Sequence, residues 1–237
     1  MNYKFVKIPL AAALALSLVL PTTTSAFASE STATANTEVP DLENQADFPV
    51  LVNGIEIYVP YEEDDVRIEK TKSFSNDAKE EIKIFDKETN EFLESYSVTD
   101  VVNSNRTNSI SPLLAGTYSQ KWVDKTTSHA TAKVTLRALL KIYSNGSFGE
   151  INSVIDHQWQ TNSGSHKLVN KKQNTISTTN KFPTLETQTV GSATIESTVD
   201  VGFQAQFEKA GFTLGGSSSG QVTMRKSIDI GFKYSIY

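Results

Sequence analysis

The sequence has no cysteine and only three histidines among its 237 residues. The absence of cysteine excludes disulfides, thiol catalysis, thiolate metal sites and lipid attachment at an N-terminal cysteine. The histidines, at positions 129, 157 and 166, do not fall at a ligand spacing such as His-Glu-x-x-His. We therefore expect no metal site and no cofactor, and a fold that is held together by core packing alone.

Long apolar runs are also scarce, and the one exception lies at the N-terminus. An apolar run over residues 8–20 follows Lys4 and Lys7 and precedes a small-x-small site, Ala26-Phe27-Ala28. This order is typical of a cleavable secretory signal peptide, here residues 1–28. The run is shorter than the roughly 20 apolar residues that a membrane span requires. The chain is therefore predicted to be secreted and extracellular.

The absence of cysteine also suggests the kind of organism from which the protein comes. Cysteine-free export is associated with Gram-positive bacteria, so a bacterial, Gram-positive origin is expected by association. The sequence has no sorting motif of the Leu-Pro-x-Thr-Gly type. Any retention at the cell wall is therefore predicted to be non-covalent.

Charge divides the chain unevenly. Residues 29–100 hold 19 acidic and 6 basic side chains, a net charge of −13, whereas residues 101–237 hold 8 and 14, a net charge of +6. We expect a disordered linker at 29–47, a small acidic β-rich unit at 48–100, a second linker at 101–112, and a basic antiparallel β domain at 113–237. The acidic unit is either a propeptide removed at 101–112 or an ordinary domain of different charge.

Two short hairpins are predicted in the acidic unit. The first turns at Asn53-Gly54 between apolar runs, since both residues of that turn tolerate positive φ. The second joins residues 82–85 to Phe92 and Leu93 across a polar turn. A unit of this size buries too little surface to be stable alone, so it is expected to pack against the rest of the chain.

The strongest pattern lies in the basic domain. Apolar and polar residues alternate over 133–142, 151–159, 193–208 and 221–236, where only Lys226 breaks the rhythm. Side chains alternate across a strand, whereas a helix would scatter these apolar groups around its circumference. The fold class is therefore predicted to be all-β and mainly antiparallel, with a C-terminal β-sandwich or elongated β-sheet domain. The runs 193–208 and 221–236 are expected to pair, and their length indicates either a bulge near Gly202 or an elongated molecule.

Motifs for catalysis are weak. Gly216-Ser217-Ser218-Ser219-Gly220 matches Gly-x-Ser-x-Gly, but a strand and not a helix is expected to follow it, so we interpret it as a turn. The acidic run Glu62–Asp65 lacks the spacing of a calcium loop and is interpreted as a solvated charge cluster. No phosphate-binding loop or dinucleotide fingerprint is present. The chain is therefore predicted not to be an enzyme, with no nucleic-acid partner.

Aromatic residues gather in one part of the basic domain. Exposed aromatic rings form binding platforms, whereas buried ones fill the core of a β-sandwich, and sequence alone favours the core. As candidate ligand-binding residues we take the following set: Tyr118, Trp122, Tyr143, His157 and Trp159.

Residues 173–237 resemble, in composition, the membrane-inserting segments of aerolysin-type toxins. That resemblance implies a pore-forming protein that acts on membranes. In those toxins the inserting segment is internal, whereas here it ends the chain. A half-buried sheet in an ordinary sandwich produces the same alternation.

Three functions remain open from the sequence. The first is a secreted, non-catalytic β-rich protein that binds a cell-surface polymer or a protein partner, with the +6 charge favouring an anionic cell-wall polymer. The second is a β-pore-forming toxin or bacteriocin-like factor. The third is a secreted polysaccharide hydrolase, which nothing in the sequence supports beyond secretion itself.

Overall fold

The computed structural model describes residues 47–73, 78–101 and 116–236. The predicted signal peptide, nearly all of the 29–47 linker and nearly all of the 101–112 linker lie outside these ranges. All described residues belong to one compact unit. Within the described ranges no helix has the length and apolarity that a membrane span requires.

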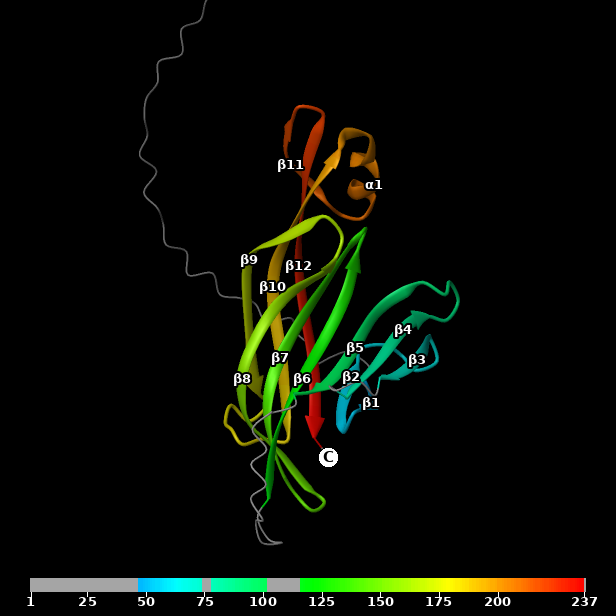
Figure 1. Ribbon diagram of the computed structural model, residues 1–237. Coiled ribbons are helices and arrows are strands. Elements are labelled where there is room, and N and C mark those ends of the chain that lie inside the picture. Colours follow the sequence, from blue (N-terminus) through cyan, green and yellow to red (C-terminus); the bar gives the residue numbers. More distant parts are fainter. Residues whose placement is uncertain (1–46, 74–77, 102–115, 237) are drawn as a thin grey trace, which may run out of the picture. The chain divides into compact units, whose positions relative to one another are not determined.

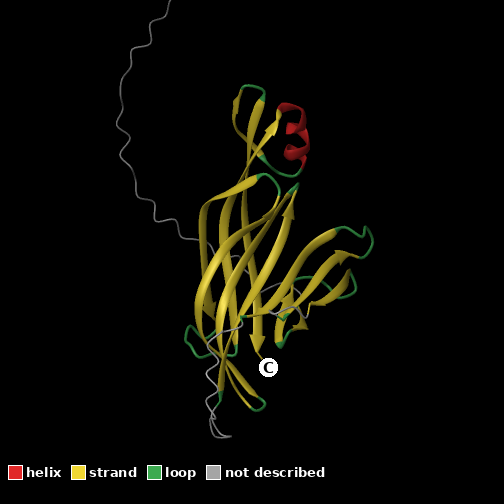
Figure 2. Ribbon diagram, viewed as in Figure 1, coloured by secondary structure: helices red, strands yellow, loops and turns green. Residues whose placement is uncertain are grey.

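The described residues form two antiparallel sheets, and the predicted all-β fold is confirmed (Figures 1 and 2). One sheet has the order β1-β2-β12-β10-β9, with β11 paired to β12, and the other runs β3-β4-β5-β6-β7-β8. The first contains β1 (Phe48–Val52), β2 (Ile55–Val59), β9 (His166–Ser177), β10 (Glu186–Asp200), β11 (Thr213–Ser218) and β12 (Gln221–Ile236). The second contains β3 (Val66–Ser73), β4 (Lys79–Asp86), β5 (Phe92–Asp100), β6 (Thr117–His129), β7 (Ala132–Asn145) and β8 (Phe148–Ser163).

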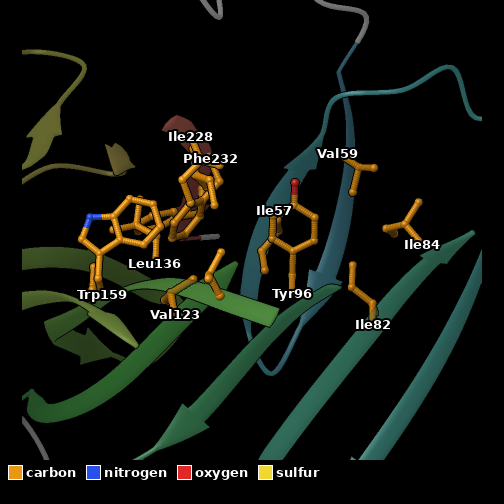
Figure 3. Close-up of a cluster of buried hydrophobic side chains, with 14 of the residues drawn as sticks. Ile57, Val59, Ile82, Ile84, Tyr96, Val123, Leu136, Trp159, Ile228 and Phe232 are labelled. Carbon is orange, nitrogen blue, oxygen red and sulfur yellow. The ribbon is translucent and has the colours of Figure 1, made fainter. Parts of the chain in front are cut away.

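The core lies between the two sheets. Figure 3 shows side chains from β2 and β12 meeting side chains from β4 to β8. Tyr96 of β5 and Phe232 of β12 pack edge to face across the gap, with ring centroids 6.2 Å apart. Most apolar members of the alternating runs face this layer, which explains the period of two in the sequence. Ile155 is instead 46% exposed, because the register shifts between Val154 and Asp156 of β8, and Val201 and Phe203, beyond the end of β10, are 53% and 56% exposed.

The acidic and basic segments share both sheets. Strand β2 pairs with β12, and β5 pairs with β6 from Glu94↔Thr127 to Asp100↔Lys121. Asn53 and Gly54 both have positive φ at the predicted first hairpin, which the structure places between β1 and β2. The acidic segment is thus hydrogen-bonded to the basic one along two strand borders. Its removal as a propeptide stays a prediction.

A buried ion pair reinforces this junction. The Lys125 ammonium of β6 lies 2.9 Å from the Glu94 carboxylate of β5, and the two side chains are only 8% and 6% exposed. Lys125 also donates to the Gly231 carbonyl of the other sheet at 3.2 Å, and the Tyr96 hydroxyl donates to Glu94 at 2.5 Å. Every charge in the cluster therefore has a partner, as burial requires.

The sequence-based strand over residues 193–208 is too long. Strand β10 ends at Asp200, which pairs with Gln221, the first residue of β12. Residues beyond Asp200 have no strand left to pair with, so their backbone groups bond locally in a 3-10 turn and in α1 (Gln204–Lys209). The bulge expected near Gly202 is therefore replaced by the end of the strand.

Lys226 holds this segment in place. It occupies an inward position on β12 and donates to the Ala210 carbonyl at 2.7 Å, just after α1. Phe207 and Phe212 are both buried and pack edge to face, with centroids 5.1 Å apart. The break in the apolar alternation at Lys226 thus reflects a specific contact with the α1 segment.

We predict that Lys125→Met lowers the free energy of unfolding by about 3–5 kcal/mol, because it leaves the Glu94 carboxylate buried without its cation. Urea denaturation followed by circular dichroism measures this loss. The double variant Lys125→Met/Glu94→Leu should recover most of it, since no unpaired charge then remains. A loss below 1 kcal/mol in the single variant would show that water reaches the pair.

Stability is also predicted to fall in mild acid. Burial and the nearby Lys226 ammonium lower the pKa of His129 from 6.5 to about 4. The unfolded chain therefore binds a proton between about pH 6.5 and pH 4 that the folded chain does not, and stability declines as the pH drops through this window. The urea midpoint should depend less steeply on pH in His129→Gln. An unchanged pH dependence in that variant would contradict the assignment.

Candidate functional site

The outward face of the β3–β8 sheet carries a polar hollow, which we call the outer groove. It encloses about 460 Å³ and is lined by side chains from β4 to β8. The lining residues are Lys79, Glu81, Lys83, Phe92, Ser95, Ser97, Thr99, Asp124, Thr126, Lys133, Thr135, Arg137, Gln160 and Asn162.

Strand register arranges this lining in rows that cross the sheet. One row runs over five strands, through Lys83, Ser95, Thr126, Thr135 and Gln160. The adjacent row runs through Glu81, Ser97, Asp124, Arg137 and Gln158. Directly opposed residues on antiparallel strands lie close enough to interact, so each row is a continuous ladder of polar groups.

Hydroxyl groups form the floor of the outer groove. Thr135 is only 2% exposed, and its hydroxyl lies 2.5 Å from that of Thr126. The Asn162 amide nitrogen donates to the same Thr135 oxygen at 2.5 Å. These contacts fix the side chains in one arrangement, so a ligand would meet hydrogen-bonding groups that are already oriented.

An ion pair lies at one side of the floor of the outer groove. Arg137 donates to Asp124 from Nε at 3.0 Å and from Nη2 at 3.3 Å, and Ser97 donates to the same carboxylate at 3.2 Å. Burial raises the pKa of Asp124, and Arg137 acts in the opposite direction. The guanidinium also stacks on Trp122, 3.9 Å from the ring centroid. Trp122 is thereby held flat beside the groove.

Three aromatic rings continue this face beyond Trp122. Tyr118 and Tyr143 lie opposite each other on β6 and β7, with ring centroids 5.2 Å apart, and Phe148 lies 6.5 Å from Tyr143. Tyr118 is 56% exposed and Phe148 is 51% exposed, which is unusual for side chains of this size. We call these three rings the aromatic shelf. The Lys141 ammonium lies 4.4 Å from the Tyr118 ring centroid.

The structure separates the five residues that the sequence suggested for ligand binding. Tyr118, Trp122 and Tyr143 share the outward face, where Tyr143 belongs to the shelf and Trp122 borders the outer groove. Trp159 and His157 lie on the opposite, inward side of β8. They are the cross-strand partners of Leu136 and Ala138, two core residues of β7.

Trp159 is a core residue and cannot contact a ligand on the outward face. It is 6% exposed, and its indole nitrogen donates to the Lys172 carbonyl of β9 at 3.0 Å. Its ring covers Gly191 of β10 so closely that a Cβ at that position would lie 3.0 Å from it. Trp159 therefore joins the two sheets.

Sequence reasoning did not single out the outer groove. Its Ser, Thr, Asn and Gln residues occupy the polar positions of alternating runs. Such positions look the same in the sequence whether the face binds a ligand or only contacts water. Only the register brings Ser95, Thr126 and Thr135 from three strands into one row.

The other chemical candidates gain no support from the described residues. These residues include no group of three or more His, Asp or Glu side chains arranged to hold a metal ion. Ser218 ends β11, and β12 begins at Gln221, so the helix that a nucleophile elbow requires is replaced by a strand. Comparison with protein-family models, curated proteins and solved structures finds no match for this chain.

Proposed function

We propose that this is a secreted, non-catalytic binding protein that holds a cell-surface polysaccharide on the outward face of the β3–β8 sheet. One observation carries the proposal: the aromatic shelf and the outer groove lie on the same face, with Trp122 between them.

The chemistry of that face suits a sugar polymer. The apolar faces of sugar rings can rest on the exposed rings of Tyr118 and Phe148, which offer a large contact area with few torsions to fix. Sugar hydroxyls both donate and accept, and the hydroxyl and amide groups of Ser, Thr, Asn and Gln do the same. A chain that stacks on the shelf could extend along the sheet into the groove.

The groove carboxylates support a binding role over hydrolysis. A glycosidase uses two carboxyl groups, one of which must donate a proton while the other remains free to act as base or nucleophile. In the outer groove Asp124 is held by Arg137, and Glu81 lies 3.4 Å from the Lys79 ammonium. Both are thus engaged with cations of the chain.

We expect Tyr118→Ala/Phe148→Ala to weaken binding to purified Gram-positive cell-wall polysaccharide by about ten- to a hundredfold, the range expected for the loss of one or two stacking contacts. Co-sedimentation with wall fragments measures the affinity. The matched control is Leu51→Ala/Leu214→Ala, which removes two side chains that are 54% and 53% exposed but lie elsewhere. Equal affinities for the two double variants would overturn the role of the shelf.

A pore-forming function is the second candidate, and strand length favours it. Strands β10 and β12 pair without interruption from Glu186↔Ser235 to Asp200↔Gln221, which exceeds the roughly 9–11 residues needed to cross a bilayer. Against it, the inward face of β12 carries Lys226, whose charge would cost about 2–4 kcal/mol in the middle of a bilayer. Dye release from liposomes at nanomolar protein would support this candidate, and intact liposomes would argue against it.

A further inference from the structure

The charges of the outer groove do not cancel. Glu81 is neutralised by Lys79, and Asp124 is neutralised by Arg137. Lys83 and Lys133 also line the groove, and within the described residues neither has a carboxylate at ion-pairing distance. Two uncompensated positive charges therefore border a hollow whose other charged side chains are paired with one another.

The surroundings of these two lysines favour an external anion. Lys83 lies between Glu69 of β3, which pairs with Arg67, and Ser95 of β5, from which the row continues through Thr126 and Thr135. The ammonium of Lys133 lies 5.4 Å from the centroid of the Phe92 ring, which also lines the groove. A concave site with a net positive charge attracts anions, and hydroxyl donors beside it can complete the coordination of an anionic oxygen.

We infer that the outer groove selects acidic polysaccharides, in which a sulfate, phosphate or carboxylate group lies between Lys83 and Lys133 while the sugar ring contacts Thr126 and Gln160, the part-exposed members of the row. This inference rests on the proposed polysaccharide-binding function and adds the class of polymer. Under this inference the shelf supplies contact with the sugar backbone, and the two lysines distinguish acidic from neutral chains.

A matched pair of ligands tests the selectivity. Dextran and dextran sulfate of equal length share one glucan backbone and differ only in charge. The intact protein should bind dextran sulfate at least about tenfold more tightly than dextran, measured by isothermal titration calorimetry at physiological salt.

A matched pair of variants tests the location. Lys83→Glu/Lys133→Glu should remove the preference for dextran sulfate. Lys171→Glu/Lys172→Glu makes the same change in net charge on exposed positions of β9, in the other sheet, and should alter the affinity by less than about threefold. Lys83→Gln/Lys133→Gln provides a milder version in case the charge reversal disturbs folding, and circular dichroism confirms the fold of each variant.

The outcomes separate the two levels of the proposal. Equal losses in the groove and β9 variants would show general electrostatic attraction and overturn the assignment to Lys83 and Lys133. Equal affinity for dextran and dextran sulfate would overturn the acidic class but leave polysaccharide binding in place. Failure to bind dextran, dextran sulfate and cell-wall polysaccharide alike would overturn the proposed function itself.

Discussion

Antiparallel pairing in a fixed register is the constraint on which the rest of this structure depends. Because side chains alternate across a strand, pairing decides at once which residues enter the core and which stand together outside it. Strand β6 shows this within five residues: Val123 and Lys125 face the other sheet, while Trp122, Asp124 and Thr126 face outward. A slip of one residue would place Asp124 in the core and expose Val123.

The same register explains how charge is distributed. Lys125 points inward and is tolerated there because Glu94 and the Gly231 carbonyl receive its donors. Asp124, the preceding residue, points outward and pairs with Arg137. Two adjacent ionisable residues thus stabilise different layers of the fold. The Lys121–Asp100 pair, at 2.5 Å, is a further contact between the basic and acidic segments. The opposite charges of the two segments therefore appear in the structure partly as ion pairs between neighbouring strands.

The outward face combines two surfaces of different chemistry. Exposed rings at the shelf offer apolar contact, and the outer groove offers fixed hydrogen-bonding groups with unpaired cations at its border. Binding sites commonly unite such elements, because apolar contact supplies affinity while a few polar groups set specificity. The stacked pair of Trp122 and Arg137 lies between them and keeps the face continuous.

The sequence by itself determined the all-β class, the inward side of most of the alternating residues and the first hairpin at Asn53-Gly54, since each depends on local periodicity or local turn chemistry. Tertiary structure decided the rest. The alternation past Asp200 predicted more strand, but β12 offered no further partner and the chain formed α1 instead. The sequence gives no sign that Trp122 and Trp159 differ in their surroundings. Strand pairing places Trp122 beside the groove and Trp159 in the core. These outcomes depend on the long-range register between strands, which no local sequence pattern encodes.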